Sequence, residues 1–353
     1  MDTRHEVGLL RLVAQGLAGP QAAGPAEAVR RLTAAQGQDF PGAVTAIALR
    51  TTGRSRDDVL AALDRGELVR SWPMRGTLHL TAAEDLPWLL DLLGERAMAG
   101  LAKRRASLEL TDADVGRACD AVVAALSGGR RLTRAELLAA IEAGGVPVTG
   151  QRGYHLLWFA AQTGHTCLGP TEDGEQLFVL LDEWVRSPRR LDRDEALAEF
   201  ATRFFTGHGP ATVQDLARWS GLLVRDARAG LAAARPGLGS LTVEGTEHFL
   251  DPATPELLAG CREEARATFL LPGFDEYVLG YGDRSAVLDP AFATHIVPGG
   301  NGMFRSTVVV DGRIVGTWRY EGRGPRRAAV GTAFRPEDAA LVAAVPELAA
   351  ALP

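Results

Sequence analysis

Lysine is almost missing from this chain of 353 residues, since 37 of its 38 basic side chains are arginines and only Lys103 is a lysine. Arginine stays protonated at ordinary pH and does not form a Schiff base. A reaction through a lysine imine therefore has only Lys103 or the terminal amine available. A codon bias toward alanine and arginine is the simplest cause, and the chemical consequence holds whatever the cause.

Cysteine and long apolar runs are also scarce. Cys119, Cys167 and Cys261 are far apart and form no Cys-x-x-Cys pair, so we interpret them as small buried side chains without metal or disulfide roles. No run approaches the ~18 apolar residues that cross a bilayer. The amino terminus has mixed charges and no apolar signal-peptide core. We therefore expect a cytoplasmic protein with no membrane partner.

The common catalytic motifs are absent as well. The seven histidines include no His-x-x-x-His or His-Glu-x-x-His pair, so we expect no metal site. No Gly-x-x-x-x-Gly-Lys loop or Gly-x-Ser-x-Gly elbow occurs, and the Gly-rich turn at 299–302 does not lead from a strand into a helix. ATP hydrolysis and a cofactor are therefore not expected. We interpret His79, between Leu78 and Leu80 on a predicted strand, as structural.

What the sequence does contain is a repeated order of elements. Hydrophobic residues make up 46% of the chain, enough for cores in two or three domains. Apolar periodicity and turn residues predict three helices followed by two strands around a turn, three times over. This order is typical of a winged helix-turn-helix. The predicted helices cover 28–35 and 56–65 after a first helical face at 7–17, then 112–126, a short helix opened by Thr133 and 154–163, then 194–205, 212–219 and 224–234; the predicted strands cover 68–72 and 77–80, 165–168 and 176–180, and 241–243 and 248–250.

The pattern of predicted elements changes to short strands after about residue 268. Two β-branched runs at 307–310 and 314–318 flank Asp311-Gly312, a strong hairpin signal, and a helix is predicted at 336–350. The fold class is therefore α+β, with three tandem winged helix-turn-helix units and a carboxy-terminal β-rich domain. The predicted domains are residues 1–100, 101–190, 191–267 and 268–353.

Charge is uneven along the chain. The formal net charge is −6, but residues 1–56 carry +3 and residues 284–327 carry +4, which leaves −13 for the rest. A basic face formed by the two ends would follow DNA phosphates. Solvated arginines spread over the surface would give the same count. The candidate DNA-binding residues are Arg75, Lys103, Arg104, Arg105, Arg305, Arg313, Arg323, Arg326 and Arg327.

Two segments place reactive groups close together. Gln36 and Gln38 are two residues apart, with Asp39 beside them, at a predicted helix end before Pro41. Glutamines at such a position usually cap carbonyls or face water. The second segment, 270–277, joins aromatic residues to the paired carboxylates Asp275 and Glu276, and structural caps or an ion pair explain it equally well.

These segments resemble the AlkZ family of bacterial DNA glycosylases, which unhook interstrand crosslinks such as those made by azinomycin B, a natural product of actinomycetes. The resemblance spans almost the whole chain, so it implies the family's fold, which we expect to place the winged units in a C-shaped arrangement. The catalytic motif of the family is two glutamines that flank one residue, which is usually apolar and is Gly37 here. The related YcaQ-like branch has an acidic residue in place of the second glutamine. The resemblance is carried by 36–38, 74–80, 271–277 and 301–305.

The resemblance implies a monomeric, nucleoid-associated enzyme acting on double-stranded DNA that carries N7-alkylguanine or crosslinks. Gln36 and Gln38 would hold the attacking water and the sugar edge, with Asp39 as an alternative base or electrostatic stabiliser. With lysine so scarce, we expect a monofunctional glycosylase that leaves an abasic site. A family β-hairpin also approaches the DNA, and our candidate is the turn within 308–318, with Arg305 and Arg313 nearby.

Two other functions fit the same sequence. A non-catalytic winged-helix regulator, or a resistance protein that sequesters adducts, would bind DNA without turnover. A winged-helix scaffold would instead meet a protein partner through its acidic middle. Loss of turnover with retained duplex affinity in a Gln36→Ala plus Gln38→Ala variant separates the enzyme from the binder, and duplex binding that is insensitive to salt would favour the scaffold.

Overall fold

A computed structural model describes residues 3–322 and 324–353 of the chain. The chain divides into two compact units, of which unit 1 combines Met1–Val59 with Leu197–Pro353 and unit 2 is Leu60–Ala196. The boundaries fall within two helices, α4 (Arg56–Asp64) and α11 (Arg193–His208). Unit 1 thus joins both ends of the chain, so that residues more than 200 positions apart share one core.

The first part of unit 1 is helical. Leu9 and Leu12 of the first helix are fully buried and pack in one cluster with Leu258, Leu271 and other residues from the second half of the chain. The Thr212 side chain caps the helix that follows it in a capping box with Asp215. The elements are α1 (Thr3–Ala14), α2 (Pro25–Leu32), β1 (Ala35–Gln36), α3 (Phe40–Ala48), α12 (Val213–Ser220), α13 (Val224–Ala234), η2 (Arg235–Gly237), β6 (Gly239–Val243), β7 (Thr246–Leu250) and α14 (Thr254–Ala265).

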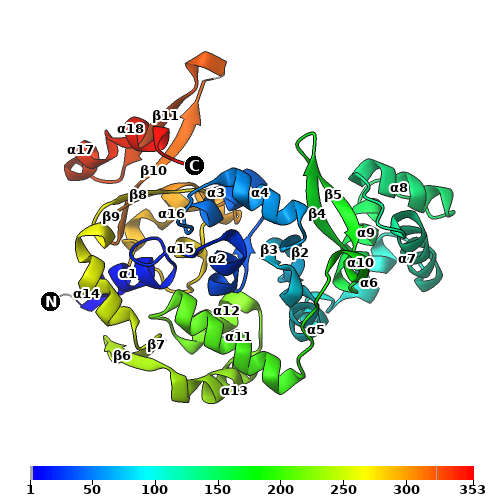
Figure 1. The fold of residues 1–353 in the computed structure, drawn as a ribbon, viewed down its shortest axis with the longest axis horizontal. Helices are drawn as coiled ribbons and strands as arrows, with labels where there is room; N and C mark the ends of the chain where they lie inside the picture. Colours follow the sequence, from blue (N-terminus) through cyan, green and yellow to red (C-terminus); the bar gives the residue numbers. More distant parts are fainter. Residues whose placement is uncertain (1–2, 323) are drawn as a thin grey trace. The chain divides into compact units, whose positions relative to one another are not determined.

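An antiparallel sheet of four strands in the order β11-β10-β9-β8 forms the last part of unit 1 (Figure 1). Trp318 and Val308 of this sheet pack with Val342 and Val345 of the closing helices. The elements are β8 (Thr268–Leu271), α15 (Glu276–Leu279), η3 (Pro290–Phe292), α16 (Ala293–Ile296), η4 (Pro298–Gly300), β9 (Thr307–Val310), β10 (Arg313–Glu321), η5 (Gly324–Arg326), β11 (Ala328–Ala333), η6 (Pro336–Asp338), α17 (Ala339–Val342) and α18 (Val345–Ala350).

Unit 2 joins its two hairpins into one sheet, because β2 pairs with β4 through Arg70 and Leu168. The wings predicted for the first two winged units are therefore continuous. Helices pack on this sheet around Leu156, Val122 and Phe178. The elements are β2 (Leu68–Met74), β3 (Thr77–Ala82), η1 (Ala83–Asp85), α5 (Leu86–Ala97), α6 (Leu101–Ser107), α7 (Asp112–Leu126), α8 (Arg134–Ala143), α9 (Arg152–Gln162), β4 (Thr166–Glu172), β5 (Glu175–Leu180) and α10 (Leu181–Trp184).

Four hairpins share the same two-residue turn. In each, both turn residues have positive φ and the second residue is glycine, which is the backbone that matches the twist of the flanking strands. The predicted turn at 169–175 is shorter than expected, because β4 continues to Glu172. The four turns are Arg75-Gly76, Asp173-Gly174, Glu244-Gly245 and Asp311-Gly312.

Several helices differ from the prediction. The helix end predicted before Pro41 is instead strand β1, followed by helix α3 from Phe40, since proline is favoured in the first turn of a helix, where no N–H partner is needed. Helices α5 and α6 were not predicted. The expected helix at 336–350 is instead the succession η6, α17 and α18, which breaks before Pro346 because proline cannot continue the hydrogen-bond ladder.

The predicted domain boundaries lie elsewhere than the limits of the two units. Unit 2 holds residues 60–100 of the first predicted domain, all of the second and the first six residues of the third, and unit 1 holds the rest. The division of the chain into four domains at residues 100, 190 and 267 follows the predicted repeat of winged units, and it remains a proposal. Residues 272–306, expected to be β-rich, contain short helices and no strand.

Candidate active site

The loop between β1 and α3 carries the glutamine pair. Gln36 ends β1 and is buried, at 8% exposure, and Gly37 is buried beside it. Gln38 and Asp39 are exposed. Asp39 precedes the first turn of α3 in extended geometry and makes no capping hydrogen bond. The loop therefore pairs one buried glutamine with an exposed amide and an exposed carboxylate.

Asp39 and the segment 271–277 flank the start of α3. A Cβ placed on Gly42 would lie 2.5 Å from Asp39 Oδ2 and 3.5 Å from the carbonyl oxygen of Gly273. Glycine at position 42 thus lets the Asp39 carboxylate lie against the helix. The two segments singled out in the sequence are therefore neighbours in the structure, although more than 230 residues separate Gly42 from Gly273.

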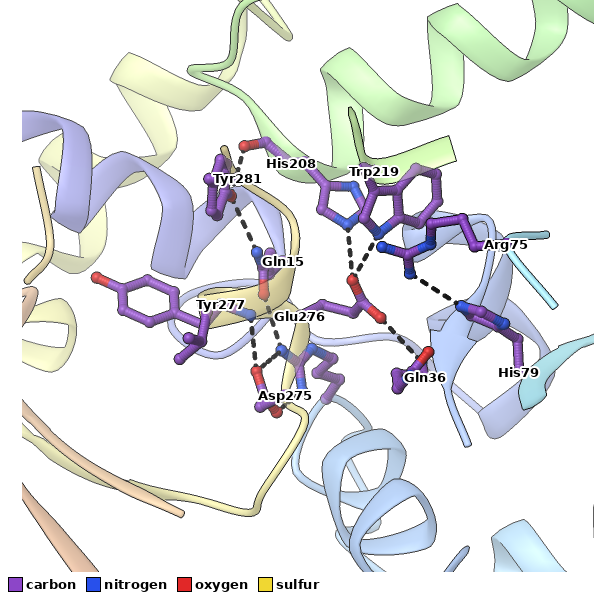
Figure 2. A network of polar contacts seen from close by, with 12 residues as sticks. Gln15, Gln36, Arg75, His79, His208, Trp219, Asp275, Glu276, Tyr277 and Tyr281 are labelled. Atoms are coloured by element: carbon purple, nitrogen blue, oxygen red, sulfur yellow. Dashed lines mark hydrogen bonds and ion pairs between the residues drawn. The ribbon is translucent and has the colours of Figure 1, made fainter. Parts of the chain in front are cut away.

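Glu276 connects these two segments directly (Figure 2). Its Oε1 accepts a hydrogen bond of 2.8 Å from the backbone N–H of Gln36, and its Oε2 accepts one of 2.8 Å from Trp219 Nε1. His208 Nε2 lies 3.7 Å from the same Oε2. Glu276 is 2% exposed and His208 is fully buried. The carboxylate thus sits behind the glutamine loop, in the interior of unit 1.

Asp275 makes a separate set of contacts. Its two oxygens accept hydrogen bonds of 2.8 and 2.9 Å from Arg50, just beyond the end of α3, and its Oδ1 also caps α15 through the N–H of Tyr277. Arg50 further donates to Gln15, which donates to the hydroxyl of Tyr281. Burial raises the pKa of Tyr281, so its hydroxyl keeps its proton. These contacts fix the carboxylate pair within a buried polar network.

Sequence reasoning found part of this site. It singled out Gln36, Gln38, Asp39 and the two carboxylates, but it left Asp275 and Glu276 with ordinary structural explanations. It missed the groups that hold them. Trp219 and Arg50 lie 57 and 225 residues away from their carboxylate partners, so no local pattern signals the contacts. The residues missed are Gln15, Arg50, His208, Trp219 and Tyr281.

The candidate DNA-binding residues of unit 2 are mostly exposed. Arg75 lies at the β2–β3 turn with its guanidinium 3.3 Å from His79 Nε2, and Lys103 and Arg104 lie on α6. Arg105 is partly buried, pairs with Asp112 at 2.6 Å, and lies over the ring of Phe159. Arg105 is thus engaged within the unit, unlike its two neighbours on the helix.

In unit 1, Arg305, Arg313, Arg326 and Arg327 are exposed, and Arg323 lies outside the described residues. Arg313 begins β10, whereas Arg326 and Arg327 follow its other end. At about 3.3 Å per residue, the nine residues of β10 separate them by roughly 26 Å. These arginines therefore do not form one patch. Arg327 lies with its guanidinium carbon 3.9 Å from the ring centre of Tyr320.

The β9–β10 turn, our candidate for the DNA-contacting hairpin, is partly covered by other elements of unit 1. Gly312 is buried, and its carbonyl oxygen accepts a hydrogen bond of 2.7 Å from Tyr277. Asp311 pairs with His5 on α1 at 3.0 Å. These contacts with α1 and α15 disfavour this turn as the DNA-contacting hairpin, which stays a prediction. In the same sheet, the β10–β11 hairpin has an exposed end, and its strands pair as far as Glu321 and Ala328 (Figure 1).

Other chemistries find little support in the described residues. Within 3–322 and 324–353, no three His, Cys, Asp or Glu side chains are grouped as a metal site requires. No helix in this part of the chain has the length and apolar character to cross a membrane. The cysteines are free thiols, Cys119 and Cys167 buried and Cys261 partly so, and burial raises the pKa of Cys167. An exposed amide and carboxylate beside an anchored glutamine remain the best candidates for chemistry.

Comparison with known proteins adds to this geometry. The family model "DNA glycosylase AlkZ-like" matches residues 29–352. An interstrand DNA cross-link repair glycosylase of Streptomyces sahachiroi is 28% identical over 317 residues, which cover 83% of this chain and 81% of that protein. The solved structure of the Streptomyces sahachiroi DNA glycosylase AlkZ matches with a TM-score of 0.80 and 25% identity, covering 99% of this chain and 96% of that one.

Proposed function

The chain belongs to the AlkZ-like DNA glycosylases, and from this premise we propose that it hydrolyses the N-glycosidic bond of N7-alkylguanine in double-stranded DNA and unhooks interstrand crosslinks. The crosslink activity is supported by the name of the Streptomyces sahachiroi relative, an interstrand cross-link repair glycosylase. The protein would act as a monomer, without a cofactor. The observation that carries the proposal is the position of the glutamine loop, inside the matched region, with Gln36 anchored and Gln38 exposed.

The chemistry suits neutral amides. A guanine alkylated at N7 is positively charged and leaves readily, so it needs little general-acid assistance. The protein has to orient a water molecule and to stabilise positive charge as the sugar becomes oxocarbenium-like. Amide oxygens accept hydrogen bonds from water and lie favourably beside developing positive charge. We assign these tasks to Gln36 and Gln38, with the exposed carboxylate of Asp39 as a further electrostatic stabiliser.

The proposed enzyme is monofunctional. Strand cleavage by glycosylases that form an imine needs an amine nucleophile at the sugar. Lys103 is the only lysine of the chain and lies exposed on α6, so besides the terminal amine it is the one amine that could form an imine. The product is therefore expected to be an abasic site in an unbroken strand. A Lys103→Arg variant should excise bases at the wild-type rate.

Excision from a duplex oligonucleotide with a single 7-methylguanine tests the assignment. In single-turnover assays, Gln36→Ala combined with Gln38→Ala should lower the rate by roughly 10²- to 10⁴-fold, because water orientation and charge stabilisation are lost. Duplex affinity should stay unchanged. Gln151→Ala, the same substitution at an exposed glutamine of unit 2, is the control. Equal rates for the double variant and the wild type would contradict the roles of both glutamines, and a wild type that binds without turnover would indicate a binding protein.

A further inference from the structure

Two adjacent carboxylates hold both ends of the segment that carries the glutamine loop. Glu276 binds the N–H of Gln36 at the end of β1, and Asp275 binds Arg50 just after α3. Both carboxylates are at most 2% exposed. Between these anchors the chain passes through Gln38 and Asp39, which are exposed. The loop is thus fixed from beneath, on the interior side, while Gln38 and Asp39 at its tip are exposed to solvent.

The Glu276 contact demands a carboxylate. Its two oxygens face two groups that can only donate, a backbone N–H and the indole N–H of Trp219. A glutamine at this position has the same shape, but it offers one oxygen and one NH₂ group. One of the two donors would then face another donor, and a buried polar group without its hydrogen bond is strongly unfavourable. Replacement by glutamine therefore removes an interaction without removing bulk.

The surroundings of Glu276 are rigid. Trp219 lies among the rings of Phe200, Phe204 and His208, with ring centres between 4.9 and 5.6 Å away. A Cβ placed on Gly280, one turn after Glu276, would lie 2.7 Å from His208 Cδ2. Close packing on this side leaves the carboxylate little freedom to follow a displaced loop. The hydrogen bond from the Gln36 N–H to Glu276 therefore holds the backbone of Gln36 in a fixed position relative to the core of unit 1.

We infer that Glu276 is a positioning residue for the glycosylase reaction, which holds the backbone of Gln36 so that its amide and that of Gln38 meet the substrate in reactive geometry. This inference rests on the proposed function of the two glutamines. Misplacement by about 1 Å can lower a rate by roughly 100-fold. Glu276 itself does not touch the substrate in this account, so it should affect the rate of excision and leave duplex binding unchanged.

Glu276→Gln tests the inference in single-turnover excision of 7-methylguanine from a duplex. The rate should fall about 100-fold, with an unchanged Kd for the duplex. In a Gln36→Ala background the same change should have a smaller effect, because one of the two amides that Glu276 positions is already lost and the two changes are then not additive. Glu6→Gln is the matched control, since Glu6 binds Arg262 in unit 1, away from the loop; its rate should equal that of the wild type.

A second measurement needs no variant. In the wild-type protein, the amide proton of Gln36 should be among the slowly exchanging ones, because it is buried and bonded to a carboxylate. Rapid exchange of this proton would overturn the inference even if Glu276→Gln failed to fold. If the wild type is active and Glu276→Gln excises at the same rate, the inference is wrong and the proposed function still holds. The same conclusion follows if the effects of Glu276→Gln and Gln36→Ala are fully additive. A wild type that excises nothing would overturn both.

Discussion

Asp275 and Glu276 follow one another in the chain, yet their contacts give them different tasks. Asp275 is fully enclosed with Arg50, which it binds through both oxygens. Glu276 accepts hydrogen bonds from the backbone N–H of Gln36 and from the indole N–H of Trp219. Removing one partner of a buried ion pair leaves the other charge uncompensated. This loss destabilises the fold by more than the intact pair stabilises it. Loss of the Asp275 carboxylate is therefore expected to lower stability, whereas Glu276 is proposed to act on the geometry of the loop.

Asp275→Asn should accordingly lower the free energy of unfolding by about 3–5 kcal/mol, because the guanidinium of Arg50 stays buried without its carboxylate. Urea denaturation monitored by tryptophan fluorescence measures this change. Glu6→Gln removes the ion pair with Arg262, which is more exposed, and should lower the free energy of unfolding by at most about 1 kcal/mol. Similar losses for the two variants would show that burial does not determine the effect of these pairs.

The Glu6–Arg262 pair also predicts a dependence on pH. The hydrogen bond from Arg262 holds the pKa of Glu6 below its ordinary value of 4.5. Because the folded pKa is the lower one, the stabilisation is fully present above 4.5 and is lost as the pH falls through the lowered value. The stability difference between the wild type and Glu6→Gln should thus be constant from pH 7 to pH 5 and shrink below 4.5. A difference that grows in acid would contradict this sign.

At the scale of elements, the β10–β11 hairpin replaces the β9–β10 turn as the proposed contact with DNA. Its end carries Arg326 and Arg327, both exposed, whereas the β9–β10 turn is covered by α1. An antiparallel hairpin that runs past the sheet it belongs to can reach a duplex without disturbing the core. Its arginines would contact phosphates, which position the protein and carry no sequence information.

Arg326→Ala combined with Arg327→Ala should weaken duplex binding and reduce the slope of log K against log salt by about 2, since each phosphate that an arginine neutralises adds roughly 0.9 to that slope. Fluorescence anisotropy over a range of salt concentrations gives both values. Arg319→Ala is a suitable control, because Arg319 lies on β10 of the same hairpin and already pairs with Glu321. An unchanged slope in the double variant would exclude this hairpin from phosphate binding.

The elements also show why parts of the structure could be predicted from the sequence and others could not. Helices at 112–126 and 224–234 were predicted with their observed bounds, and the four Gly-containing turns were recognised, because both signals are local. Helix α3 was missed because a proline such as Pro41 can follow the end of one helix as well as lie in the first turn of another. The contact between Gln36 and Glu276 spans 240 residues, and no local pattern encodes it.

At the scale of the whole molecule, the charge distribution limits what a measurement of duplex binding can reveal about function. The net charge of −6 opposes DNA, so affinity has to come from local clusters such as the end of the β10–β11 hairpin and the exposed Lys103 and Arg104 of α6. Duplex binding would then be steeply dependent on salt for a catalytic and for a non-catalytic protein alike. Only turnover distinguishes the two.

The most direct test of the central claim is therefore the product of the reaction. The purified protein is incubated with a duplex that contains one 7-methylguanine, the free base is measured by mass spectrometry, and the strand is examined before and after alkaline treatment. We predict release of free 7-methylguanine from a strand that stays intact until alkali cleaves it at the abasic site. Folded protein that binds the duplex but releases no base, or a strand already cut before alkali, would contradict the account.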